Sequence, residues 1–349
     1  MTSRHYPLAA VLACCVTLLV GCGGAASAPV PGTPASNGAG TTAGFPLEIT
    51  NCGQSLRFDG PPTKAVSMDQ ISTEIMLHLG LERSMVGTAH RSGEIFAGGA
   101  GFPSLSDAYE TVPVLDEKYP SQEALLNAAP DFVTGNADTY TFGPTTEGGT
   151  GFTREDMAAQ GIKTYTFLCD GETATTDLLL TRFEEFGRIF GKGEAAKTMV
   201  DQVRSSLAAT EKVLAGTPPV KTFGYSSGTG PLSTYGGTGQ FANGLKQSGG
   251  QGIFDELPSF PTPTVTAEQV IARNPDAIVI VDLGLLGGSD APDNAAKKAL
   301  LVSTLGPGVN AIKNDRFCYL DFLGFTTGPR IATSTDSTAR CLHPELNFD

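Results

Sequence analysis

Apolar residues recur every three or four positions along residues 193–216, which is the spacing of one helix face. The apolar positions are Ala196, Met199, Val200, Val203, Leu207 and Leu214. Glycine stands at each end of the segment and no proline falls inside it. The pattern predicts one unbroken helix of about 22 residues, roughly 33 Å long, which is enough to reach from one small domain to another.

The segments on either side of this helix carry the same short motif. Residues 121–126 read Ser-Gln-Glu-Ala-Leu-Leu and residues 266–271 read Thr-Ala-Glu-Gln-Val-Ile, at an offset of 145 residues, and each is followed by a Pro-Asp pair and an apolar run. In each copy a hydroxyl residue is placed to cap a short helix, and a glutamate follows in its first turn. A proline then ends the helix before a strand. Two copies in register indicate two related lobes.

Short apolar runs alternate with helical patterns in both lobes. Strands are predicted near residues 65–68, 86–88, 112–115, 131–134, 163–168, 221–225, 277–282 and 316–320. Further helices are predicted near residues 72–79, 154–160, 177–190, 239–246, 294–303 and 330–342. Strands separated by helices are typical of parallel βα units. The predicted fold class is therefore α/β, with two Rossmann-like lobes of parallel-rich sheet joined by one long rigid helix.

The first 21 residues have the features of an export signal. Arg4 precedes an apolar run over residues 8–20, which is too short to span a bilayer. The run ends in Leu19-Val20-Gly21-Cys22, which resembles the lipobox of bacterial lipoproteins and implies that Cys22 becomes a lipid-bearing N-terminus. The alternative is an ordinary signal peptide with an incidental cysteine. An exported protein anchored to the cell membrane is expected.

Composition divides the rest of the chain. Residues 22–45 are almost wholly Ala, Gly, Pro, Ser and Thr, which predicts a flexible tether. The motif positions then predict a first lobe over residues 46–175, connecting helices over 176–216 and a second lobe over 217–349. The net charge is −13 and the basic residues form no run. This pattern argues against nucleic acid as a partner.

Motifs typical of common enzymes are absent from the sequence. It contains no Gly-x-Ser-x-Gly elbow, no Walker phosphate loop and no His-Glu-x-x-His pair. After loss of the signal the chain holds only His78, His90 and His343. A binding protein is therefore favoured over an enzyme, and neither a cofactor nor a resident metal is expected.

Four cysteines remain in the predicted mature chain besides Cys22: Cys52, Cys169, Cys318 and Cys341. An even number in an exported protein indicates two disulfides, for which three pairings are possible. We favour Cys52–Cys169 and Cys318–Cys341, because each pair then lies within one lobe. A zinc site built on Cys341 and His343 would need two more ligands.

Candidate ligand contacts follow the strands, because ligands of open α/β sheets sit outside the carboxyl ends of the strands. A bulky, partly polar ligand calls for aromatic rings and a few charges. The candidates in the two lobes are Asp69, Arg91, Tyr119, Asn136, Tyr225, Phe260, Asp282 and Phe325, with Phe322 as an alternative to Phe325.

Several motifs together resemble one family. They are the lipobox, Ile49-Thr50-Asn51-Cys52-Gly53, Pro62-x-x-Ala65-Val66-Ser67, Thr73-Glu74-Ile75, both Pro-Asp repeats, Gly250-x-x-Ile253-Phe254 and Gly328-Pro329-Arg330. The chain is similar over residues 46–345 to the solute-binding lipoproteins of ABC importers that take up ferric siderophores, cobalamin or haem. The resemblance implies two α/β lobes joined by one rigid helix.

The same resemblance implies partners and roles. In this family a glutamate on each lobe docks onto arginines of the permease, and those positions match Glu123 and Glu268. The expected partners are an ABC permease with its ATPase and a metal chelate, bound by a monomer. Cobalamin binders tend to place tryptophan in the cleft, and this chain has none, which favours a ferric siderophore over cobalamin or haem. Arg91, or secondarily Arg330, would face an anionic chelate. A lipoprotein that senses rather than transports is the alternative.

Overall fold

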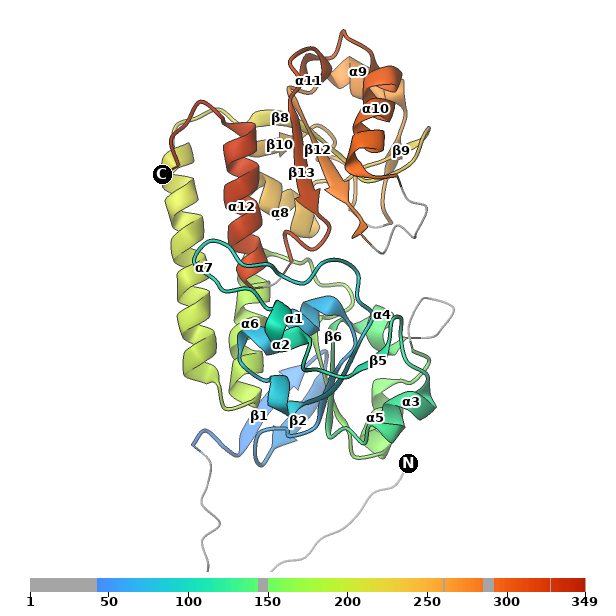
Figure 1. The fold of residues 1–349 in the computed structure, drawn as a ribbon, viewed down its shortest axis with the longest axis vertical. Coiled ribbons are helices and arrows are strands. Elements are labelled where there is room, and N and C mark those ends of the chain that lie inside the picture. Colours follow the sequence, from blue (N-terminus) through green and yellow to red (C-terminus); the bar gives the residue numbers. More distant parts are fainter. Residues whose placement is uncertain (1–42, 144–149, 260, 285–291, 327, 349) are drawn as a thin grey trace, which may run out of the picture. The chain divides into compact units, whose positions relative to one another are not determined.

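The computed structural model describes residues 43–143, 150–259, 261–284, 292–326 and 328–348. Within these ranges the predicted fold class is confirmed, because the chain forms two α/β lobes, each built on a parallel sheet (Figure 1). The predicted signal segment, Cys22 and nearly all of the predicted tether lie outside the described residues.

The sheet of the first lobe has five parallel strands in the order β5-β4-β3-β6-β7. The strands are β3 (Ala65–Ser67), β4 (Met85–Ala89), β5 (Val114–Asp116), β6 (Phe132–Ala137) and β7 (Lys163–Leu168). The chain extends from β3 towards one edge and then returns to β6 on the other side. The strand order therefore reverses between β3 and β6, and such a switch point is where open α/β sheets bind ligands.

Helices cover both faces of this sheet. Because alternate strand residues point to opposite sides, neighbouring residues of one strand pack against different helices. Phe132 packs in the layer that contains α1 and the connecting helices, whereas Val133 packs in the layer that contains α3 and α5. The helices of the lobe are α1 (Gln70–His78), α2 (Ser106–Tyr109), α3 (Gln122–Asn127), α4 (Asp138–Phe142) and α5 (Arg154–Ala159), with a 3-10 turn at Glu82–Ser84.

The second lobe repeats this plan with four parallel strands in the order β10-β8-β12-β13. They are β8 (Val220–Tyr225), β10 (Gly250–Gly252), β12 (Ala277–Asp282) and β13 (Phe317–Asp321). The order reverses between β8 and β12, so this lobe has its own switch point. A two-stranded antiparallel pair, β9 (Leu232–Ser233) with β11 (Thr264–Val265), accompanies the sheet.

The faces of the second sheet also pack against different helices. Ile278 and Ile280 lie in a core with α9, α10 and α11, whereas Val279 and Val281 lie in a core with α8 and α12. The helices are α8 (Gly239–Gln247), α9 (Ala267–Arg273), α10 (Asn294–Leu305), α11 (Asn310–Lys313) and α12 (Pro329–Leu342).

The long helix is present as predicted and is unbroken. It is α7, Gly193–Leu214, and it packs against both α6 (Thr176–Ile189) and α12 of the second lobe (Figure 1). Ala196, Val200 and Val203 are buried on its inner face. A Cβ placed on Gly187 of α6 would lie 2.3 Å from the Cβ of Ala196, so only glycine permits this close approach of the two helices.

The repeat extends to individual hydrogen bonds. The hydroxyl of Ser121 accepts the N–H of Ala124 at the start of α3, and the hydroxyl of Thr266 accepts the N–H of Gln269 at the start of α9. Past each helix, the aspartate of the Pro-Asp pair donates its backbone N–H to a lysine carbonyl, Asp131 to Lys64 and Asp276 to Lys221. The two lobes therefore share local geometry as well as sequence.

Both disulfides of the favoured pairing are present. Cys52 is bonded to Cys169 in the first lobe and Cys318 to Cys341 in the second. The zinc alternative is excluded in this structure because Cys341 is in a disulfide.

Several short elements were not predicted, among them α2, α4, α11, β9, β10 and β11, and neither was one hairpin that reaches the core. An antiparallel hairpin of β1 (Leu47–Asn51) and β2 (Gln54–Phe58) precedes the first sheet, and its alternate residues Leu47, Ile49 and Phe58 enter the core of the first lobe.

Candidate ligand-binding site

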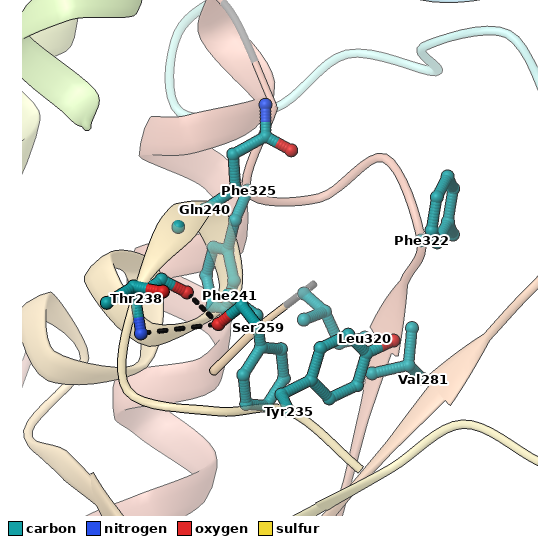
Figure 2. Close-up of a pocket in the computed structure, with 10 residues that line it drawn as sticks. Tyr235, Thr238, Gln240, Phe241, Ser259, Val281, Leu320, Phe322 and Phe325 are labelled. Carbon is teal, nitrogen blue, oxygen red and sulfur yellow. Dashed lines mark hydrogen bonds between the residues drawn. The ribbon is translucent and has the colours of Figure 1, made fainter. Parts of the chain in front are cut away.

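An aromatic hollow lies at the carboxyl ends of β12 and β13 in the second lobe (Figure 2). Its volume is about 180 Å³. Val281 and Leu320, the penultimate residues of the two strands, belong to the core layer between the sheet and α8. The hollow therefore continues this core to the surface. Its lining residues are Tyr235, Thr238, Gly239, Gln240, Phe241, Ser259, Val281, Leu320, Phe322 and Phe325.

Four aromatic side chains give the hollow its character. The rings of Tyr235 and Phe241 stack with centroids 4.0 Å apart and an interplanar angle of 16°, and Phe325 meets Phe241 edge-on at 6.1 Å. Phe322 stands on the loop after β13 and is 41% exposed. The apolar walls and the exposed ring of Phe322 offer contacts to an apolar or aromatic group of a ligand.

Polar groups are placed at the edge of this hollow. Ser259 accepts a hydrogen bond from the N–H of Thr238 at 3.2 Å and donates to its carbonyl oxygen. The Nε2 atom of Gln240 is buried and has no partner among the described residues. Burial raises the pKa of Tyr235 to about 12, so its hydroxyl is protonated at neutral pH. The Thr238 N–H and the Ser259 hydroxyl are used by each other, whereas the buried Gln240 amide keeps an unused donor among the described residues.

In the first lobe, the predicted contact Tyr119 stacks on His90, and the predicted contact Asp69 lies close to both rings. His90, just after β4, stacks on Tyr119 with centroids 4.6 Å apart and an angle of 17°. Burial lowers the pKa of His90, and the charge of Asp69 opposes that change. Burial also raises the pKa of Tyr119, helped by Asp69. The structure therefore brings Tyr119 and Asp69 together around a neutral imidazole.

Asp69 is committed to the fold. Its Oδ1 atom accepts the N–H of Ser72 at 2.9 Å, which caps α1, and its Oδ2 atom accepts the N–H of Asn136 at 2.5 Å. The side chain is buried, and burial raises the pKa of this carboxyl while the two N–H groups lower it. Both carboxylate oxygens already accept hydrogen bonds from the backbone. Asp69 therefore connects the end of β3 to β6 across the switch point.

Arg91 and Asn136 occupy the same end of the first sheet. Arg91 donates from Nε to the carbonyl of Gly93 at 2.9 Å and pairs with Glu94 at 3.2 Å, yet its side chain remains 38% exposed. The backbone N–H of Asn136 donates to Asp69, and the Oδ1 atom of Asn136 is buried with no partner in the described part of the chain. Arg91 thus retains the exposure that contact with an anionic ligand requires.

Two other predicted contacts, Tyr225 and Arg330, are buried. Tyr225 is 1% exposed, lies in the core beside Phe223 and donates its hydroxyl to the carbonyl of Gly228 at 2.8 Å. Arg330 forms a buried pair with Glu74 rather than facing a cleft. The polar groups of Tyr225 and Arg330 are therefore already satisfied inside the protein, and their predicted contacts with ligand stay predictions.

The other predicted contacts in the second lobe have separate outcomes. Phe325 lines the aromatic hollow, as does its alternative Phe322. Asp282, at the end of β12, is exposed and accepts hydrogen bonds from Gly284 and Asn294. Phe260 lies outside the described residues.

The two repeat glutamates are exposed at equivalent positions. Glu123 lies in the first turn of α3 and Glu268 in the first turn of α9. A hydrogen bond from the Thr266 side chain and one from the backbone lower the pKa of Glu268. Both carboxylates are therefore accessible to a partner.

Sequence reasoning missed Tyr235 and Phe241. Tyr235 follows β9, a strand of two residues that no alternation could reveal, and Phe241 lies on a predicted helix whose inner face was unknown. A pattern of two aromatic residues six positions apart, between glycine clusters, was the available signal.

The described residues lack a metal-ligand cluster and a membrane-spanning helix. No group of three or more His, Cys, Asp or Glu side chains in these ranges could hold a metal ion. No helix within them has the length and hydrophobicity needed to cross a bilayer.

Two parallel α/β lobes joined by a long helix, with an aromatic hollow at the strand ends, define a two-lobed solute-binding protein. The sequence profile of the periplasmic binding protein family matches residues 66–322. The chain therefore belongs to the periplasmic binding protein family.

Individual relatives agree with this assignment. A periplasmic binding protein from Veillonella parvula is 29% identical, with a TM-score of 0.71 over 85% of this chain and 97% of that one. A structure from Saccharomonospora viridis, described as an ABC-type Fe3+-hydroxamate transport system, is 25% identical, with a TM-score of 0.65 over 86% and 98%. A vitamin B12-binding protein of Photorhabdus laumondii is 32% identical over 126 residues, 36% of this chain and 44% of that protein.

Proposed function

We propose that this protein is the extracytoplasmic solute-binding component of an ABC importer and that its ligand is a metal chelate, most specifically a ferric siderophore. The observation that carries the proposal is the aromatic hollow formed by Tyr235, Phe241, Phe322 and Phe325 at the strand ends. Binding at this place fits the general rule for open α/β sheets. Cobalamin or haem, captured by the same mechanism, are the alternatives.

Three observations favour a siderophore over the alternatives. The chain has no tryptophan, the residue expected in the cleft of corrinoid binders. Among the solved structures, the one described as an Fe3+-hydroxamate transport system has a TM-score of 0.65 with this chain, against 0.58 for a vitamin B12-binding protein of Vibrio cholerae. The partly exposed guanidinium of Arg91 and the unused amide donor of Gln240 suit the oxygen-rich surface of an anionic chelate.

Glu123 and Glu268 are the proposed docking contacts with the permease. Each is exposed in the first turn of a repeat helix, one on each lobe, so a two-fold arrangement of arginines could hold both. Delivery of the ligand, rather than chemistry on it, is the proposed outcome of docking.

The proposed placement in the cell follows from the N-terminal sequence. Residues 1–21 act as the lipoprotein signal, Cys22 carries the lipid and residues 22–45 act as a tether. The lobes over residues 46–175 and 217–349, joined by 176–216, then work as a monomer outside the membrane.

A titration panel tests the proposal. The purified mature chain is titrated in a calorimeter with ferric hydroxamate and ferric catecholate siderophores, their iron-free forms, haemin and cyanocobalamin. We expect a ferric siderophore to bind with a Kd below about 1 μM and its iron-free form more weakly. Tight binding of haemin or cyanocobalamin alone would select the corresponding alternative. Dissociation constants above about 10 μM for the whole panel would refute the proposed function.

A further inference from the structure

A buried ion pair connects two motifs that lie 256 residues apart in the sequence. Arg330, in the first turn of α12, donates from Nε to Oε2 of Glu74 on α1 at 2.6 Å and from Nη2 to Oε1 at 2.7 Å. The side chains are 11% and 6% exposed. A bidentate pair of this geometry is both strong and directional, and it joins a helix of the second lobe to a helix of the first.

The pair also holds a loop. The Nη2 atom of Arg330 donates to the carbonyl of Glu94 at 2.6 Å, and Oε1 of Glu74 accepts the N–H of Phe96 at 3.1 Å. The guanidinium lies over the ring of Phe96, 5.7 Å from its centroid. Segment 92–96 is therefore fixed from both lobes at once.

Gln70 completes the network on the side of the first lobe. Its Nε2 atom donates to Glu74 at 3.0 Å and to the carbonyl of Glu94 at 2.8 Å. Its Oε1 atom accepts the N–H groups of Ser92 and Gly93 at 2.9 and 2.7 Å. Three of these four hydrogen bonds hold segment 92–96, and the fourth ties Gln70 to Glu74.

Segment 92–96 also lies against the strand ends of the second lobe. A Cβ placed on Gly284, just after β12, would lie 2.7 Å from the carbonyl oxygen of Ser92, and one placed on Gly93 would lie 3.8 Å from Oδ2 of Asp321. The segment follows His90 and Arg91 directly. It therefore connects the first lobe's proposed ligand contacts to the loops that border the second lobe's sheet.

We propose that Arg330 and Glu74 are a positioning pair: by fixing segment 92–96 between the lobes, they hold Arg91 and the opposed strand ends in the arrangement that binds ligand. The claim that the pair raises ligand affinity rests on the proposed function. The claim that the pair fixes segment 92–96 does not. A preorganised site binds more tightly because less ordering is left to be done on binding.

Hydrogen–deuterium exchange of the full mature chain tests the part that is independent of ligand. The amides of Ser92, Gly93 and Phe96 donate to Gln70 or Glu74, so they should exchange slowly in the wild type. In Arg330→Met we expect the peptide that contains residues 92–96 to exchange at least tenfold faster. Arg330→Lys, which keeps the charge but not the two-pronged geometry, should fall between the two.

A second buried arginine provides the matched control. Arg154 pairs with Asp138 at 3.2 Å inside the first lobe and its side chain is 5% exposed. Arg154→Met should lower stability but leave the exchange of residues 92–96 within about twofold of the wild type. If Arg330→Met does not fold, the exchange of residues 92–96 is compared instead between Arg330→Lys or Glu74→Gln and the wild type, with the same control.

The effect of the pair on ligand affinity is measured by calorimetry, as the Kd of the tightest chelate of the panel. Arg330→Met should raise its Kd at least tenfold, with Arg330→Lys between it and the wild type, while Arg154→Met leaves it within twofold. Unchanged exchange of residues 92–96 in Arg330→Met, or an equal change in Arg154→Met, would overturn the positioning role. Failure of the wild type to bind any chelate would refute the proposed function and leave the exchange result to decide the role of the pair.

Discussion

The Oδ2 atom of Asp69 lies 2.5 Å from the backbone nitrogen of Asn136, which ties the carboxyl end of β3 to that of β6. Because the other oxygen caps α1, one carboxylate satisfies two backbone N–H groups at the switch point of the first sheet. Asp69 thus supports the backbone around it, and its predicted contact with ligand stays a prediction.

Removal of this carboxylate should destabilise the protein. Asp69→Ala leaves two N–H groups without acceptors, so we expect the free energy of unfolding to fall by about 2–4 kcal/mol in urea denaturation. Asp293→Ala is the control, because Asp293 caps α10 from an exposed position and, in the described part of the chain, its side chain accepts a single N–H, that of Ala296. That variant should lose about 1 kcal/mol. A loss of ligand affinity in Asp69→Ala without a loss of stability would restore Asp69 as a ligand contact.

Phe322 provides a test of the aromatic hollow that leaves the core intact. The ring is exposed and lines the hollow, so Phe322→Ala should weaken binding of the chelate about tenfold, or about 1.4 kcal/mol. Stability should change by less than about 0.5 kcal/mol. Tyr319→Ala is the matched control, since Tyr319 is an aromatic residue of β13 outside the hollow and is 49% exposed, against 41% for Phe322. Equal effects of the two substitutions on Kd would argue against binding at the hollow.

Charge reversal tests the proposed docking residues. Glu123→Arg combined with Glu268→Arg should abolish uptake of the chelate in cells, because each lobe would then repel an arginine of the permease. Ligand affinity of the purified protein should remain within twofold of the wild type. Glu194→Arg reverses another exposed glutamate in a helix first turn, on α7, and should leave uptake unchanged. Normal uptake by the double variant would remove these residues from the interface.

His78 should make stability depend on pH. Burial, with a smaller effect from the charge of Arg330, lowers the pKa of His78 to about 3, against about 6.5 in the unfolded chain. Between these values the unfolded chain binds one more proton, so stability falls as the pH is lowered. The Nε2 atom of His78 is buried without a partner among the described residues, so His78→Phe removes no hydrogen bond from this atom.

The measurement is the free energy of unfolding of both proteins at pH 7.5 and pH 5.0. We expect His78→Phe to gain about 2 kcal/mol relative to the wild type over this change of pH. Met76→Leu, at a buried position on the same helix, should show no such dependence. A difference between His78→Phe and wild type that is constant with pH would contradict the buried, neutral imidazole.

Features with a strong local pattern were predictable from the sequence. The helix at Gly193–Leu214 has an unbroken periodicity, and the repeat has capping residues, glutamates and prolines at matching positions. The hairpin of Leu47–Asn51 and Gln54–Phe58 was missed, although its residues alternate. Its strands have only five residues each, and the turn at Cys52-Gly53 was interpreted only as part of a family motif.

The roles of single polar residues could not be predicted to the same degree. Strand β8 is buried on both faces, so its sequence did not reveal that Tyr225 points into the core. Arg330 is satisfied by Glu74, which precedes it by 256 residues, and no local pattern encodes that contact. Side chains at the ends of strands can either bind ligand or support the loops that do, and tertiary contacts decide between these roles.

A crystal structure of the protein with the tightest chelate of the panel would test the central claim most directly, because it locates the ligand. We predict that the chelate lies at the carboxyl ends of β12 and β13, against Tyr235, Phe322 and Phe325, with Arg91 within hydrogen-bond distance of its oxygen atoms. A chelate bound with none of these residues in contact would contradict the proposed site.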